Sequence, residues 1–240
     1  IRYSKERPSY KISLAYENGR IFWEQRNIAH DLSVNADLSV CGVELEFFKF
    51  RYRNSLLTGS GSFQNWASPQ LRIHAAGLYD AQDLILAHPS INEGRGVIGV
   101  TADIRHDRDG VEVDGNFSVK SGGYRGMDLR DVAGRFEIRQ NVLYLRNVSG
   151  KIAQGIFHVR SEIQLREANR DPNRVVATSK GVPVVQVGRL LDLPLLRFQN
   201  TADASTAISW KRGEEDLRVD SDVFLHGWMP SSSQPDHTTP

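Results

Sequence analysis

The amino-acid sequence predicts an all-β protein, mainly an antiparallel meander. Apolar side chains recur at every second residue over most of the chain, which is the period of a strand with one buried face. Short turn signals rich in Gly and Asn separate these runs at hairpin spacing. A helical signal is limited to one short segment, 183–193, which begins at Pro183 and ends before Pro194.

The first part of the chain supplies three alternating runs. "KISLAY" is followed by Asn18-Gly19, a pair that favours a two-residue hairpin turn because both residues accept positive φ. "LSVNADLSV" (32–40) alternates throughout. "VELEFFKFRY" (43–52) changes parity in its middle, which predicts a β-bulge near Phe47–Phe48.

The second part continues the pattern. "HDRDG" separates alternating residues 98–104 from 111–119, and Gln140-Asn141 and Gln154-Gly155 predict two more turns. The polar stretch 166–181 contains Pro172 and is expected to be a loop. After Pro230 the chain is a low-complexity tail that has no means of forming a core.

Composition narrows the function classes. The chain has 240 residues, of which 40% are hydrophobic and 25% charged, as is usual for a soluble globular protein. The formal net charge of +1 shows no basic excess, so no nucleic-acid partner is expected. Cys41 is the single cysteine and excludes an intrachain disulfide. The chain begins at Ile1 without a signal peptide, and we expect it to be part of a longer protein.

No motif in the sequence predicts an enzyme. "HDRDGVEVDG" contains His106 and Asp114 but lacks the spacing of a calcium loop, so a charged hairpin tip is the better interpretation. The seven histidines show no paired ligand spacing, and no serine lies in a nucleophile elbow. We therefore expect no catalytic residue, no metal and no cofactor.

Two parts of the chain share one layout. Asp31-Leu32 and Asp128-Leu129 each begin an alternating strand that is followed by a turn, an apolar strand and a Gly turn, at an offset of about 97 residues. A third unit is predicted from "TADASTAISW" onward. We thus divide the chain into β repeat units (1–178), a short helix with the start of a further unit (179–229), and a disordered tail (230–240).

Three stretches resemble the AsmA/TamB-like family of bacterial envelope proteins. They are "MDLRDVAGRFEIRQNVLYLRNVSGKIAQGIFHVRSEIQL", "LSVCGVELEFFKFRYRNSLLTGSGSF", and "LLDLP" followed by a strand that ends in "ISW". The resemblance covers most of residues 10–228. It implies a long sheet curled into an open groove with an apolar interior, in a protein that is anchored in the inner membrane and spans the periplasm. The family resembles bridge-like lipid-transfer proteins and is linked to translocation and assembly of outer-membrane proteins.

The expected function follows from this resemblance. The chain would be a periplasmic segment, anchored by a part of the protein outside it, that carries phospholipids between the inner and outer membranes for outer-membrane biogenesis. Phospholipid acyl chains would be its partners, and an outer-membrane barrel protein would contact the rest of the parent chain. One sheet with an apolar face needs a cover, and acyl chains would supply it.

Two alternatives remain open at this point. The first is a scaffold that assembles or translocates outer-membrane proteins by pairing a free sheet edge with client strands. The second is a carbohydrate-binding or adhesion β-sandwich, because strand periodicity alone is equally compatible with two packed sheets.

The residues expected to line the lipid groove share the apolar parity of their strands. They are Ile12, Leu14, Leu32, Val34, Leu38, Leu45, Phe47, Ile98, Val100, Ile104, Val111, Val113, Phe117, Val119, Phe136, Ile138, Phe157, Val159, Ile163, Leu165, Leu217, Val219, Val223 and Leu225.

Overall fold

A computed structural model gives the arrangement of most of the chain. It describes residues 11–23, 26–83, 94–108, 110–124, 126–165, 171–186, 200–211 and 216–227. The predicted tail 230–240 and most of the predicted helix 183–193 lie outside these ranges. Within them, residues 81–83 and 184–186 form short helical turns.

The described residues form thirteen strands, which follow one another in chain order. They are β1 (Lys11–Trp23), β2 (Arg26–Ser39), β3 (Gly42–Tyr52), β4 (Ser55–Gln64), β5 (Gln70–Asp80), β6 (Gly94–Asp107), β7 (Gly110–Tyr124), β8 (Met127–Arg139), β9 (Val142–Ile152), β10 (Gly155–Gln164), β11 (Asn173–Pro183), β12 (Thr201–Trp210) and β13 (Arg218–His226).

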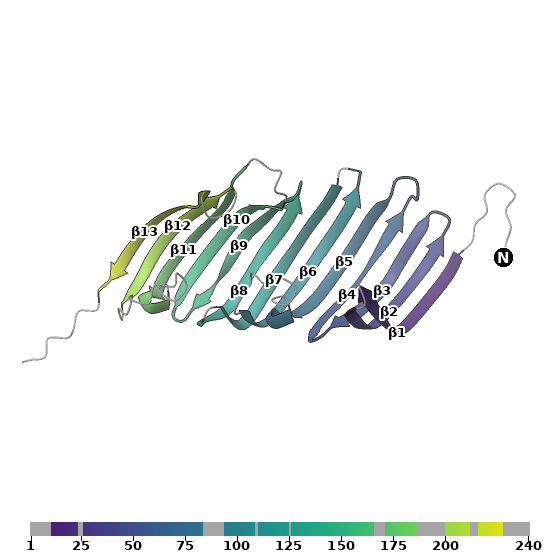
Figure 1. Ribbon diagram of the computed structural model, residues 1–240, viewed down its shortest axis with the longest axis horizontal. Coiled ribbons are helices and arrows are strands. Elements are labelled where there is room, and N and C mark those ends of the chain that lie inside the picture. Colours follow the sequence, from purple (N-terminus) through teal and green to yellow (C-terminus); the bar gives the residue numbers. More distant parts are fainter. Residues whose placement is uncertain are drawn as a thin grey trace, which may run out of the picture.

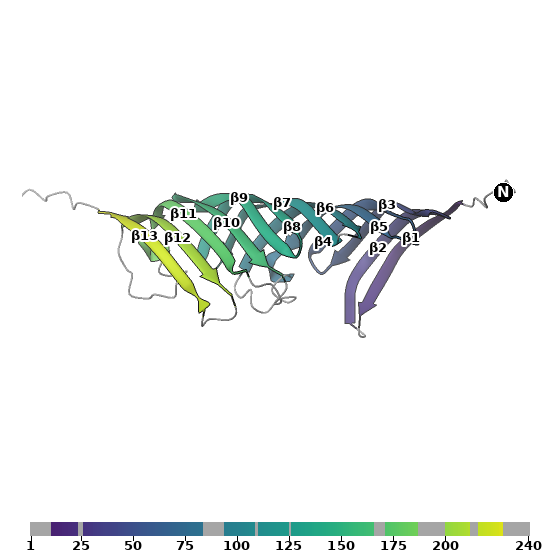
Figure 2. The same cartoon turned by 90° about the horizontal axis from the view of Figure 1, so that it is seen from above.

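All thirteen strands form one antiparallel sheet in which each strand pairs with its sequence neighbours (Figure 1). The sheet is open, with β1 and β13 at its two edges. Figure 2 shows that both ends of the sheet bend toward the same side. The predicted all-β meander, curved and open, is therefore confirmed. The described residues contain no second sheet, so the sandwich interpretation of the same periodicity is wrong.

Cross-strand register gives the sheet one apolar and one polar face. Directly opposed residues share a face, so the pairs of Phe117 with Val100 and Gly134 place these side chains together. We call this side the apolar face. The other side, which includes Asp103 and Asp114, is the polar face.

A bulge keeps β3 in phase with its neighbours. Leu45 pairs with Gly61 and Phe48 with Gly59, so Glu46 and Phe47 are opposed by one residue of β4. The predicted bulge near Phe47–Phe48 is confirmed within one residue. Because a bulge adds one residue to one strand, Phe48 instead of Phe47 follows Leu45 on the apolar face.

The predicted hairpin at Asn18-Gly19 is wrong. β1 continues through this pair and remains paired with β2 until Trp23 opposes Arg26. Asn18 has φ 57°, and the register shifts between Tyr16 and Gly19. The pair therefore forms a bulge within a strand, which uses the same positive-φ tolerance that a hairpin turn requires.

The predicted loop over 166–181 is also wrong for its second half, because β11 begins at Asn173. Val175 and Ala177 alternate onto the apolar face, where Val175 lies between Ser161 and Ile208. The residues between them face the other side of the sheet. By contrast, the turns predicted at 106–110, 140–141 and 154–155 occur within one residue of their expected positions.

The two units repeat with an offset of 100 residues, which corrects the predicted 97. In the first unit Asp31 has φ 53° at a bulge in β2, and its carboxylate lies 3.6 Å from Arg51 Nε. In the second unit Asp131 has φ 48° at the same bulge in β8, and its carboxylate lies 2.9 Å from Lys151 Nζ. A helical turn follows β5 and β11 alike. β12 and β13 therefore follow the second helical turn as β6 and β7 follow the first. The predicted boundary between residues 178 and 179 falls inside β11.

Aromatic rings cover glycines of neighbouring strands on the apolar face. Four phenylalanines lie directly opposite a glycine, in the pairs Phe48–Gly59, Phe117–Gly134, Phe136–Gly115 and Phe157–Gly150. A Cβ built on Gly134 would lie 2.9 Å from the Phe117 ring, and one on Gly150 would lie 2.9 Å from Phe157. Because glycine has no side chain, each ring can lie over the backbone of the neighbouring strand. The sheet is therefore partly covered by its own aromatic residues.

We predict that Gly115→Ala destabilises the protein by about 1–3 kcal/mol, because overpacking forces backbone shifts. The new Cβ would lie 2.5 Å from the Thr101 carbonyl oxygen and would also clash with the Phe136 ring. Urea unfolding measures the decrease in stability. Gly99→Ala is the matched control in the adjacent strand, where the nearest atom to a Cβ is a rotatable hydroxyl at 3.2 Å. Equal destabilisation of the two variants would contradict the packing explanation.

Candidate binding faces of the sheet

The apolar face gathers most of the residues predicted from strand parity. Its rows run across the sheet, as in the series Ile73, Ile104, Val113 and Ile138. The predicted residues placed on this face are Ile12, Leu14, Leu32, Val34, Leu38, Leu45, Ile98, Val100, Ile104, Val113, Phe117, Val119, Phe136, Ile138, Phe157, Val159, Ile163, Val219, Val223 and Leu225.

Three predicted residues lie elsewhere, and a fourth, Val111, lies at the margin of the apolar face. Phe47 opposes Asn35 and is on the polar face, so its assignment to the apolar row is wrong. Val111 keeps the apolar parity but opposes His106 next to the β6–β7 turn. Leu165 follows the end of β10, and Leu217 precedes β13. Each of the four is at least 42% exposed.

Sequence reasoning missed several apolar-face residues. They include Phe48, Phe50, Leu57, Phe63, Ile73, Tyr79, Val132, Leu145, Val148 and Val175. The alternation in 71–79 would have found the β5 members. A β-bulge shifts by one residue which side chains face the apolar side. Applying this shift after the predicted bulge in β3 would have identified Phe48 and Phe50.

Exposure varies across the apolar face. Leu14 in β1 is 50% exposed and Val223 in β13 is 59% exposed, whereas Val132 in β8 is buried. Edge strands have neighbours on one side only, which explains the difference. No large side chain of the described residues is fully buried, as expected where one sheet has no packed second layer. The face therefore offers an extended apolar strip to a partner.

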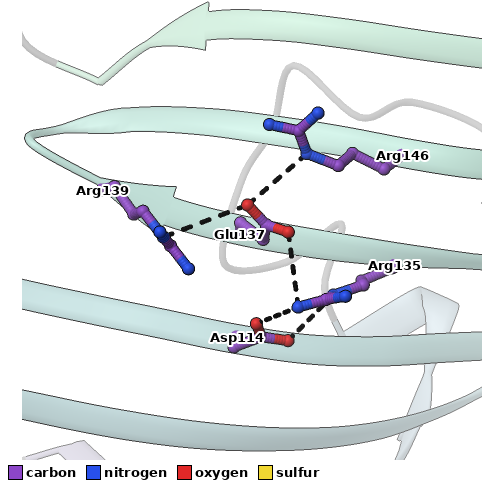
Figure 3. A network of polar contacts seen from close by, with 5 residues as sticks. All are labelled: Asp114, Arg135, Glu137, Arg139 and Arg146. Carbon is purple, nitrogen blue, oxygen red and sulfur yellow. Dashed lines mark hydrogen bonds and ion pairs between the residues drawn. The ribbon is translucent and has the colours of Figure 1, made fainter.

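The polar face carries a network of charges between β7, β8 and β9 (Figure 3). Glu137 is buried, and its carboxylate forms ion pairs with Arg135 and Arg146, each at 3.4 Å, and with Arg139 at 4.0 Å. Arg135 also makes a two-point contact with Asp114. The register places Asp114 directly opposite Glu137, and Arg135 directly opposite Arg146. The ion pairs instead join acids to arginines diagonally across the strands, which reduces the repulsion between like charges.

The Arg135 contact lowers the pKa of Asp114 below its ordinary value. The hydrogen bond from the guanidinium is the main cause, and the positive charge of Arg135 adds to it. Asp114 also raises the pKa of Arg135 through the same hydrogen bond. Both shifts favour the charged pair at neutral pH.

Small side chains leave a shallow depression of about 790 Å³ on the polar face. Thr58, Ala76, Thr101, Ser118 and Ala133 belong to its lining and come from five adjacent strands. Val100 and Phe117 also border this depression, although register places their side chains on the apolar face. The apolar face is correspondingly an open surface built from large side chains and not this hollow.

The described residues offer neither a cluster of metal ligands nor a membrane-spanning helix. Of the residues that the structure describes, no three His, Cys, Asp or Glu side chains are grouped in a way that could hold a metal ion. His106 Nδ1 lies 3.1 Å from the Gly110 carbonyl oxygen, within its own hairpin. No described helix has both the length and the hydropathy needed to cross a membrane.

Comparison of the chain with family models, curated proteins and solved structures finds no match. The resemblance to the AsmA/TamB-like family therefore stays a prediction that rests on the motifs themselves. Function has to be argued from the two faces of the sheet.

We predict that the stability of the protein falls as pH drops below about 4 and that Asp114→Asn reduces this fall. A carboxyl group whose folded pKa is lowered contributes stability above its unfolded pKa, and that contribution disappears as pH falls through the folded value. Thermal melts between neutral and acid pH measure the slope. Glu112→Gln is the control from the same strand, since Glu112 makes no ion pair with a described residue. An unchanged slope in Asp114→Asn would contradict the assignment.

Proposed function

We propose that this chain is a lipid-carrying segment of a cell-envelope protein that passes phospholipids along the apolar face between two membranes. One observation carries the proposal. The apolar parity is kept in register across the described strands from β1 to β13, with Ser161, Ser179, Thr206 and Ser221 interrupting it between β10 and β13, so the apolar surface extends along the sheet as one strip.

The chemistry of the strip suits acyl chains. Aliphatic and phenylalanine side chains dominate its centre and present no hydrogen-bonding group. An acyl chain bound there therefore leaves no polar side chain of the protein without a hydrogen-bond partner. Burying each CH₂ contributes about 0.8 kcal/mol, and a sixteen-carbon chain would gain roughly 10 kcal/mol before the entropic cost of binding. An open strip allows such a chain to slide along the sheet, because the apolar surface ahead of the chain resembles the surface that it leaves.

The periplasmic location, the inner-membrane anchor in another part of the parent protein, and the role in outer-membrane biogenesis belong to the same proposal. They derive from the resemblance of the "MDLRDVAGRFEIR" and "LLTGSGSF" regions to the AsmA/TamB-like family. The continuous strip supports that resemblance because an open sheet with one apolar face is the architecture that it implies.

The test places three carboxylates on the strip. Val113→Asp, Phe117→Asp and Phe136→Asp together should reduce phospholipid that copurifies with the protein to background, because a buried carboxylate beside an acyl chain is unfavourable. Organic extraction followed by mass spectrometry measures the lipid. The fold should persist with reduced stability, because these three residues are half-buried, while the Phe117 and Phe136 rings that cover Gly134 and Gly115 are lost.

A matched control adds the same charge to the other face. Thr101→Asp, Ser118→Asp and Ser149→Asp lie on the polar face and should leave bound lipid unchanged. Circular dichroism melts confirm that both variants are folded. Lipid-free wild-type protein, or equal lipid in the two variants, would refute the proposal.

The open edges favour one second candidate function, the assembly of outer-membrane proteins by β-augmentation. Among the described strands, β13 has a neighbour on one side only, and all its residues from Arg218 to His226 are exposed. A strand with unpaired backbone N–H and C=O groups can accept a further strand from a client.

A photo-crosslinker at Ser221 in β13 should then capture an unfolded outer-membrane protein, whereas one at Ser118 in the interior strand β7 should not. Mass spectrometry of the product identifies the client strand. Equal capture at the two positions would mean nonspecific contact and would exclude this candidate.

A further inference from the structure

Three arginines line a depression of about 520 Å³ on the polar face of the second repeat unit. Arg146, Arg160 and Arg174 come from the adjacent strands β9, β10 and β11. Tyr144 and Glu162 complete the titratable groups of the lining. The depression is therefore basic, although the chain as a whole is almost neutral.

The positive charge of this depression is only partly compensated, because three arginines share Glu162 in the lining and Glu137 beside it. Arg146 Nε lies 3.4 Å from Glu137, and the Arg146 guanidinium stacks over the Tyr144 ring at 5.2 Å. Neither Arg160 nor Arg174 has a carboxylate within ion-pair distance among the described residues, although Glu162 directly opposes Arg174 in the register. Unpaired guanidinium groups on adjacent strands repel one another, which an anion would relieve.

A bulge brings the charges together. Val159 pairs with Val148 and Ser161 with Leu145, so Arg160 faces the two bulged residues Arg146 and Asn147. Asn147 has φ 53°. The bulge turns both of its side chains toward the depression, which is how bulges redirect residues at binding sites.

The first repeat unit serves as an internal comparison. The same bulge occurs at Glu46 and Phe47, opposite Ser60. At equivalent positions, 100 residues apart, the second unit has Arg146 and Arg160 where the first unit has Glu46 and Ser60. The backbone pairing is the same in both units. The fold accommodates an acid and a serine at these positions, so it does not require the two arginines.

We propose that this depression binds a phosphate group. A phosphate presents oxygens in several directions and can accept hydrogen bonds from guanidinium groups of three strands, whereas a carboxylate presents two oxygens along one edge. The Tyr144 hydroxyl can donate a further bond. The phosphate belongs to a lipid headgroup or to a soluble phosphorylated compound. The site lies on the face opposite the apolar strip, so it does not rest on the proposed function.

Calorimetric titration of the protein with inorganic phosphate at low ionic strength tests the site. Saturable binding is expected, and Arg160→Ser and Arg174→Ser should each weaken it roughly tenfold or more, because each removes a charge-assisted hydrogen bond. Arg160→Ser introduces the residue that the first unit has at the equivalent position. Arg105→Ser removes the same charge from the polar face outside the depression and should leave binding unchanged.

Cosedimentation with vesicles separates the two sources of phosphate. Binding to phosphatidylcholine vesicles that contain phosphatidic acid, reduced in Arg160→Ser, assigns a lipid headgroup. Binding of inorganic phosphate without such vesicle binding assigns a soluble ligand.

Modification of arginines by phenylglyoxal adds a readout on the wild-type protein, where phosphate should protect Arg160 and Arg174 but not Arg105. Absent saturable binding, or binding and protection that do not involve Arg160 and Arg174, would overturn the proposal.

Discussion

Cross-strand register is the constraint on which the rest of this structure depends. In a single sheet without a packed second layer, a slip of one residue would move apolar side chains to the polar face. Bulges at Asp31 and at Glu46–Phe47 absorb the extra residues that would cause such a slip in β2 and β3. The same bulges recur 100 residues later, so the correction is part of the repeating unit.

The phenylalanine rings of the apolar face both pack the sheet and form its outer surface. Phenylalanine rings lie over glycines of the neighbouring strands, as Phe117 does over Gly134, and this gives the sheet apolar contacts that a second layer would otherwise supply. The rings still leave their outer surfaces open. The inner side of each ring therefore contributes to packing, and the outer side is the surface on which the proposed ligand would lie.

The two repeat units share a backbone but not a polar surface. In the first unit Glu46 accepts a hydrogen bond from Asn35 beside the bulge, whereas in the second unit Arg146 occupies that position and contacts Glu137. A repeated sheet fixes the directions of side chains while leaving their chemistry free to differ. The apolar face thus extends over both units, whereas the basic depression belongs to the second unit.

The sequence by itself determined the fold class, the turns at 106–110 and 140–141, and most of the apolar face, because these depend on a period of two along each strand and on the turn residues between strands. Only the tertiary structure decided that Asn18-Gly19 is a bulge, that Asn173–Pro183 is a strand, and that Phe47 faces the polar side. Each of these depends on the partner strand, since one residue pair can form a turn or a bulge according to what lies opposite. The same reason applies to the basic depression: Arg146, Arg160 and Arg174 are separated along the chain, and only strand pairing brings them together.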